Sequence, residues 1–250
     1  MSAKKIKGSK KRFETTEEIV GLSQRATDYA RENPYMIIAA VAGILLLLGI
    51  FWGVSSYRQA NERRARAEYS KIVQGWPAND FAGYKDWDKV VPKLQDFIKQ
   101  HQGTQPALNA QLDLAQAYFW MKRYDDSVKV ANTLLNETSA ENPLRPLVRY
   151  HLALTYEEMN KIDDAITQWK DLAKAGVKGL EREISWHLAR LYADKKEYTK
   201  AVEQYENALK SNGGYPSTQQ IQQELEMAKL KTAPVSNGSK KGSAQPNSQG

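Results

Sequence analysis

The side chains of this sequence that could carry acid–base chemistry are two pairs of adjacent aspartates and three histidines. Paired carboxylates can act as general acid and base, and histidine titrates near neutral pH. However, the histidines lie far apart, no glycine-rich phosphate loop follows a strand, and no nucleophile motif is present. The absence of cysteine excludes disulfides, thiol nucleophiles and cysteine-ligated metals. An enzyme is therefore disfavoured, and no catalytic, cofactor or metal site is predicted. The residues considered are Asp125, Asp126, Asp163, Asp164, His101, His151 and His187.

The two aspartate pairs occupy equivalent places in a pattern that the sequence repeats. Each copy has a leucine followed directly by an alanine, and then a tyrosine three residues after the alanine. The tyrosines are 38 and 36 residues apart, and the excess over the roughly 34 residues of a regular helical repeat falls in loops at 141–143 and 176–179. Three irregular helical repeats are therefore predicted. Their marker residues are Leu114, Ala115, Tyr118; Leu152, Ala153, Tyr156; and Leu188, Ala189, Tyr192.

Each copy is interpreted as a pair of helices. The alanine lets the two helices approach closely, and the tyrosine fills the space beside them. Asp125, Asp163 and Thr199 are expected to begin the second helices, where their side-chain oxygens would cap free backbone N–H groups. The aspartate pairs are thus interpreted as caps rather than catalytic groups. His151 and His187 each directly precede a Leu-Ala pair and are interpreted as structural residues.

This pattern resembles the tetratricopeptide repeat (TPR) family. The sequence departs from that family at Gln111, Ser127 and Ala131, so the first copy is the least typical. The resemblance implies an all-α fold, here a TPR-type α-solenoid of about three to four helix pairs, with a groove formed mainly by the first helices. The resemblance rests on Leu114, Ala115, Tyr118, Tyr124, Leu152, Ala153, Tyr156, Ala165, Leu188, Ala189, Tyr192, Tyr198, Ala201 and Ala208.

A continuous apolar segment precedes the repeats. From Met36 to Val54 every residue is apolar or small and uncharged, which is about the length needed to cross a hydrocarbon core of roughly 30 Å as a helix. Tyr35, Tyr57 and Trp52 lie near its ends, where amphipathic rings favour the headgroup level. A buried core helix would show a polar face, and a cleaved signal peptide would be shorter. A single N-terminal transmembrane helix over residues 35–57 is predicted.

Basic residues flank this segment on both sides, so charge alone leaves its orientation open. The residues before it, 1–34, form a basic tail in which Thr15 and Thr16 could begin an amphipathic helix against anionic lipid, or the tail could be a disordered solubilising segment. The net charge of +7 is spread along the chain without a concentrated basic stripe, which disfavours nucleic acid as a partner.

The remaining domain boundaries follow from composition and pattern. Residues 58–105 are expected to form a helix that continues from the span and then a degenerate repeat. Three TPR units are expected over 106–216. A capping helix over 217–231 and a disordered tail over 232–250 would follow them. Within the span, Gly49 and Gly53 form a GxxxG spacing. These glycines are either a homodimer face or ordinary span composition.

The groove positions of the TPR pattern can be named in this sequence. They include several aromatic residues and few charges, which favours apolar or extended partner segments over an acidic C-terminal tail. For Trp120 and Trp186, lining the groove and packing between repeats remain equal alternatives. The predicted groove comprises Asn109, Leu112, Gln116, Phe119, Trp120, Tyr150, Leu154, Glu157, Trp186, Arg190 and Asp194.

The whole layout, a short tail, one span and a TPR-like domain, resembles the YfgM-like family of bacterial envelope proteins, which are ancillary subunits of the Sec translocon. This resemblance covers 35–231 and implies an inner-membrane protein with a cytoplasmic N-terminus and a periplasmic C-terminal domain. Its partners would be translocon subunits or exported clients passed to chaperones. A scaffold for another envelope complex, or a cytoplasm-facing adaptor with reversed topology, fits the residues as alternatives.

Overall fold

The computed structural model describes residues 31–32, 34–74, 76, 84 and 86–232, and within them the regular structure is entirely α-helical. The all-α prediction is therefore confirmed. The chain divides into two units, Met1–Arg63 and Arg64–Gly250. The predicted amphipathic helix near Thr15 and the predicted disordered tail after residue 232 lie outside the described residues.

The first described helix, α2 (Pro34–Val73), has 40 residues and contributes to both units. Its N-terminal part contains the apolar segment, whose side chains are exposed along their whole length. By length and composition this helix can cross a membrane. At the other end of α2, Ala65 is fully buried against Trp87 and Leu94, so this end belongs to the hydrophobic core of the second unit.

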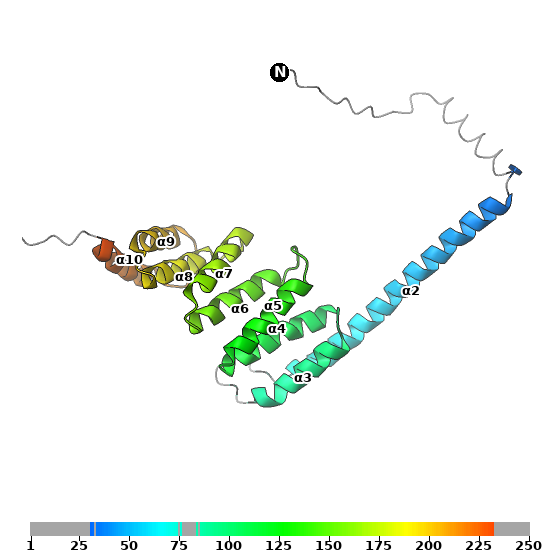
Figure 1. The fold of residues 1–250 in the computed structure, drawn as a ribbon, viewed down its shortest axis with the longest axis horizontal. Helices are drawn as coiled ribbons and strands as arrows, with labels where there is room; N and C mark the ends of the chain where they lie inside the picture. Colours follow the sequence, from blue (N-terminus) through cyan, green and yellow to red (C-terminus); the bar gives the residue numbers. More distant parts are fainter. Residues whose placement is uncertain (1–30, 33, 75, 77–83, 85, 233–250) are drawn as a thin grey trace, which may run out of the picture. The chain divides into compact units, whose positions relative to one another are not determined.

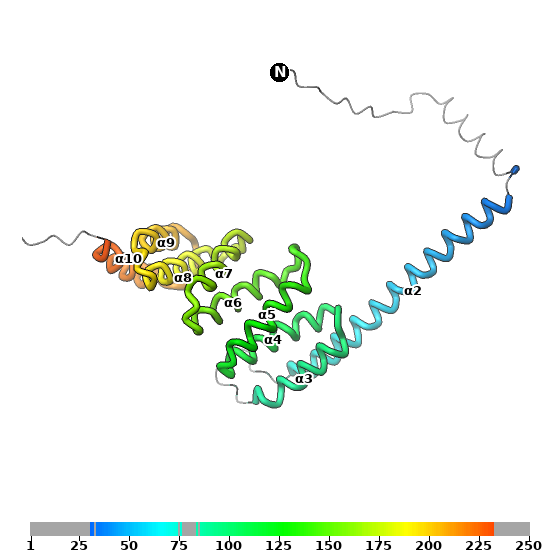
Figure 2. Tube along the Cα trace, in the orientation of Figure 1, coloured from blue at the N-terminus to red at the C-terminus, as the bar shows by residue number. Residues whose placement is uncertain are grey.

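The second unit is a stack of helices in which each helix packs against the next one along the chain (Figure 1). Helices α4 and α5, α6 and α7, and α8 and α9 form three pairs, and α3 and α10 pack at the two ends of this series. The backbone trace passes back and forth through the pairs (Figure 2). The bounds are α3 (Trp87–Gln100), α4 (Gln105–Trp120), α5 (Tyr124–Glu137), α6 (Arg145–Glu158), α7 (Ile162–Ala175), α8 (Glu181–Asp194), α9 (Tyr198–Lys210) and α10 (Thr218–Thr232).

The turn inside each pair has the same backbone design. The middle residues Lys122, Asn160 and Lys196 have φ of 58°, 55° and 62°, a left-handed conformation that non-glycine residues rarely adopt. The following N–H bonds back to the carbonyl of the repeat tyrosine, for example Arg123 N to Tyr118 O at 2.8 Å. This is the Schellman arrangement that satisfies free carbonyls at a helix end. The three sequence repeats are therefore also repeats of local backbone geometry.

The predicted capping role of Asp125, Asp163 and Thr199 is wrong. Helices α5, α7 and α9 begin one residue earlier, and their N-cap positions have no side-chain capping hydrogen bond. The Schellman turn explains the difference, because its last residue serves as the N-cap and leaves the aspartates inside the first turn. There they still interact favourably with the helix dipole, and Asp126 forms a 2.6 Å ion pair with Arg123.

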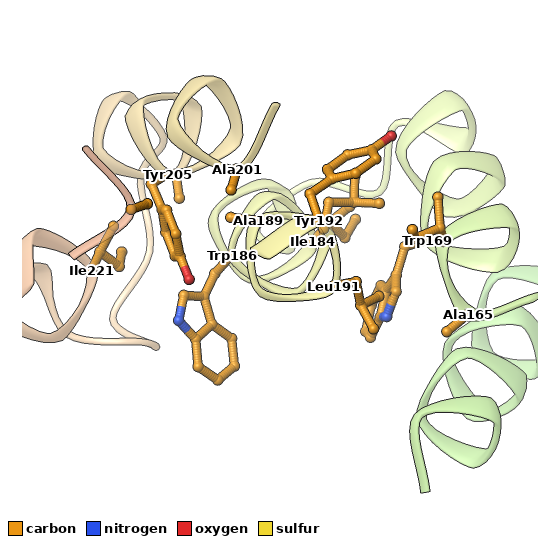
Figure 3. Packing of buried hydrophobic residues seen from close by; sticks show 14 of the residues in the cluster. Ala165, Trp169, Ile184, Trp186, Ala189, Leu191, Tyr192, Ala201, Tyr205 and Ile221 are labelled. Carbon is orange, nitrogen blue, oxygen red and sulfur yellow. The ribbon is translucent and has the colours of Figure 1, made fainter. Parts of the chain in front are cut away.

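The core of the stack is built from small residues at the helix crossings and large residues between them. Ala115, Ala153 and Ala189 are completely buried, as the close approach of paired helices requires. Side chains of α8 pack on two sides: Trp186 lies beside Tyr205 and Ile221, whereas Leu191 lies beside Trp169 (Figure 3). Helix α8 therefore joins the hydrophobic contacts of its own pair to those of the preceding pair.

Candidate functional site

Two neighbouring pockets lie over the first helices of the three pairs. The α4–α6 pocket has a volume of about 340 Å³, and the α6–α8 pocket has a volume of about 420 Å³. Phe119, Trp120 and Leu154 line both pockets. Because they share these wall residues, the two pockets are adjacent, and we call them together the groove.

The groove brings together nine of the eleven residues predicted for it. The α4–α6 pocket contains Leu112, Gln116, Phe119, Trp120, Tyr150 and Leu154, and the α6–α8 pocket adds Glu157, Arg190 and Asp194. Each belongs to α4, α6 or α8, so the helical spacing places them on one face.

The other two predicted residues do not line either pocket. Asn109 is half-buried about one to three turns before the lining residues of α4. Trp186 is 5% exposed and its Nε1 donates a hydrogen bond to Glu224 Oε2 on α10 at 2.7 Å. Of the two alternatives for Trp186, the structure thus shows packing, here against the last helices of the stack.

Several groove residues were missed by the sequence prediction. Leu147 is the most prominent, since it is 53% exposed and lines the α4–α6 pocket. Its position three residues before Tyr150 and seven before Leu154 on α6 is the signal that could have identified it. The others are His151, Glu158, Asn160, Ile162, His187 and Leu191.

The exposed wall of the α4–α6 pocket is aromatic. Trp120 is 41% exposed, and the edge of its ring meets Phe119 with ring centroids 5.2 Å apart. Phe119 in turn makes edge contacts with Tyr124 and His151. Phe119 is therefore fixed by its neighbours, while Trp120 presents apolar surface to solvent, the arrangement expected of an anchor site for a partner side chain.

Carboxylates hold the aromatic residues behind the groove. Trp169 Nε1 donates to Glu157 Oε1 at 2.6 Å, and the Tyr150 hydroxyl donates to Glu183 Oε1 at 2.7 Å. Burial and the adjacent Glu183 raise the pKa of Tyr150 above its usual value, so its hydroxyl stays protonated as a donor. The His187 ring stacks on Trp169, with its Nδ1 2.8 Å from Glu157 Oε1. Glu157 therefore acts mainly as an internal support of the groove wall.

The histidines have separate structural settings. His101 Nε2 lies 2.7 Å from Glu68, and His151 Nε2 lies 2.7 Å from the buried Ser127 hydroxyl. Burial lowers the pKa of His151 to about 4, so its imidazole is neutral at physiological pH. In the part of the chain that the structure describes, no group of three or more His, Asp or Glu side chains is placed to hold a metal ion.

The paired helices, their buried alanines and their Schellman turns define a TPR-type helical repeat protein, a fold that serves as a scaffold for protein–protein interaction. Residues 29–231 match the family described as tetratricopeptide repeat-like domain. The chain belongs to this family. The predicted TPR resemblance and the α-solenoid are thereby confirmed.

Solved structures support the same fold. The chain is similar to MamA, with a TM-score of 0.53 and 14% identity over 67% of this chain and 82% of that chain. It is also similar to the TPR-like repeats of a putative kinesin light chain from Podosopora anserina, with a TM-score of 0.53 and 18% identity over 68% and 87% of the two chains. At these identities the likeness shows the fold alone. Among curated proteins, none matches this sequence.

Proposed function

We propose that this protein is a membrane-anchored TPR adaptor that holds apolar segments of other proteins in the groove. The observation that carries the proposal is the pair of adjacent pockets over α4, α6 and α8, with Trp120 and Leu147 exposed in them. Exposed apolar side chains gathered in a depression are characteristic of protein interaction sites, because a partner gains by removing them from water.

The proposed anchor is the apolar part of α2, over residues 35–57. Its exposed Leu, Ile and Phe side chains would be costly in water and are suited to lipid. The resemblance to the YfgM-like family supports an inner-membrane location with the repeats on the periplasmic side. In that setting the partners would be Sec translocon subunits or exported clients.

Photocrosslinking tests the groove in the intact membrane-embedded chain. A benzoylphenylalanine probe replaces Trp120 or Leu147, and the matched control replaces Glu203, an exposed residue of α9 that does not line the groove. The groove probes are expected to yield partner adducts that mass spectrometry identifies and that the control lacks. Equal adducts from all three positions would contradict the proposal. Many different clients would favour a holding role, and one dedicated partner would favour a scaffold for another envelope complex.

A reporter that is active only outside the cytoplasm, fused after Lys231, tests the orientation. Activity is expected. A silent but well-expressed fusion would contradict the periplasmic placement and favour the cytoplasm-facing adaptor, leaving the groove proposal to the crosslinking result.

The span could also join two copies of the chain. Gly49 and Gly53 are one helical turn apart, and apart from the adjacent backbone of the helix itself no atom lies within 4 Å of where a Cβ would stand at either position. This face therefore has room for the close approach of a second helix. We propose a homodimer through this face as an accessory feature of the anchor.

A further inference from the structure

The charges in the groove are unevenly distributed. Among the described residues that line the α4–α6 pocket, none is Asp, Glu, Lys or Arg. The α6–α8 pocket is lined by three carboxylates, on Glu157, Glu158 and Asp194, and by one guanidinium, on Arg190. The groove thus has an apolar section over α4 and α6 and an acidic section toward α8.

The cation of the acidic section is already engaged. The Arg190 guanidinium lies over the Trp186 ring, 4.7 Å from its centroid. Lys195, the residue after Asp194, is bound by Asp163 and lies 3.4 Å from Glu197. Among the described residues, neither cation forms an ion pair with a carboxylate that lines the pocket, so the three carboxylates still outnumber the single guanidinium.

Two of the three carboxylates remain accessible to a partner. Glu157 accepts a hydrogen bond from Trp169 in the groove wall. Glu158 and Asp194 are exposed, and Glu158 receives only a long 3.4 Å hydrogen bond from Tyr124. They would attract a cation close to the apolar contacts made at Trp120.

We propose that the groove selects segments in which large apolar side chains are flanked on one side by lysine or arginine. This inference rests on the proposed function and specifies its partner. The apolar side chains would pack against Trp120 and Leu147, and the basic residue would pair with Glu158 and Asp194. A partner with an acidic end would instead meet like charges, which disfavours it.

Peptide binding to the full chain in lipid nanodiscs tests the inference. Three fluorescent peptides share one apolar core and differ at one end, which carries two lysines, two glutamines or two glutamates. Each peptide is made twice, with the charged or amide pair before the core in one version and after it in the other. Anisotropy is measured against empty nanodiscs, so that lipid partitioning is subtracted. The lysine peptide is expected to bind roughly fivefold more tightly than the glutamine peptide at low salt, and the difference should shrink at high salt.

Two charge-reversal variants locate the effect. Glu158→Lys with Asp194→Lys should remove the preference for the lysine peptide. The matched control, Asp164→Lys with Glu203→Lys, changes the net charge equally at exposed positions outside the groove lining and should keep the preference.

Each outcome decides between the two proposals. Equal binding of all peptides, a preference for glutamate, or loss of the preference in the control variant overturns the inference while leaving apolar binding in the groove intact. If no peptide binds the wild-type chain above the empty nanodiscs, the proposed function and the inference fail together.

Discussion

The Ser127 hydroxyl on α5 lies 2.7 Å from His151 Nε2 on α6 and donates a 2.7 Å hydrogen bond to the carbonyl of Ala115 on α4. Ser127 and His151 are both buried. Because the hydroxyl has one proton and gives it to Ala115, the imidazole is the donor in the second bond. This network joins two successive helix pairs at the wall of the α4–α6 pocket, which His151 lines.

Substitution of Ser127 by alanine should destabilise the chain, even though removal of the hydroxyl leaves only a small cavity. It leaves the buried His151 N–H without an acceptor, which costs about 1–3 kcal/mol. Urea unfolding of the intact chain in nanodiscs, followed by circular dichroism, measures the loss. The double variant Ser127→Ala, His151→Leu should recover most of it, because both polar partners are gone. An unchanged unfolding midpoint for Ser127→Ala would contradict the network.

The stability of the second unit should depend on pH through His151. Its pKa falls from 6.5 to about 4 on burial in the folded chain. Between these values the unfolded chain binds a proton that the folded chain does not. Stability should therefore fall as the pH is lowered from 6.5 to 4, by about 3 kcal/mol from this residue. Urea titrations at successive pH values measure the slope.

The titration of Asp113 should change the stability in the opposite direction from that of His151 over part of the same pH range. Burial raises its pKa from 3.8 to about 6, against the effect of the hydrogen bond from Tyr69. Its contribution to stability is present below pH 3.8 and is lost as the pH rises through 6. Asp113→Asn keeps an acceptor for Tyr69, and it should therefore make stability fall more steeply as the pH is lowered. In His151→Leu, stability should instead rise as the pH is lowered. Variants with pH profiles parallel to the wild type would contradict both assignments.

Two tryptophans on different helices, Trp120 on α4 and Trp169 on α7, should respond differently to truncation. Trp169 is fully buried, so Trp169→Ala should cost about 3–5 kcal/mol. Trp120 is 41% exposed, so Trp120→Ala removes less buried surface and should cost only about 1–2 kcal/mol. The same Trp120 variant should reduce partner crosslinking from a probe at Leu147. A large stability loss at Trp120 would show that it is a core residue instead.

Bulky residues on the proposed dimer face should separate the spans. Gly49→Leu with Gly53→Leu is expected to reduce the homodimer fraction in vesicles, measured by energy transfer between labelled chains. Gly43→Leu is the matched control, since Gly43 has the same open surroundings but a different helical face. An equal reduction in both variants would contradict a specific interface at Gly49 and Gly53.

The sequence by itself determined the all-α class, the repeated helix pairs and most of the residues that line the two pockets. These features depend on local spacing. Ala115, Ala153 and Ala189 recur where helices cross, and side chains three or four residues apart necessarily share a helix face. For this reason the residues predicted on α6, such as Tyr150 and Leu154, line the groove together.

The tertiary structure decided the roles of individual side chains. Trp120 and Trp186 both lie on first helices, and no local pattern distinguishes them. Trp186 is buried because it packs in one cluster with Tyr205 of α9 and Ile221 of α10, where Glu224 accepts its N–H, whereas the pocket beside Trp120 stays open. Likewise, the Schellman turns moved the helix starts ahead of Asp125 and Asp163 and so removed their capping role. The burial of a side chain depends on its neighbours in space, which spacing along one helix does not specify.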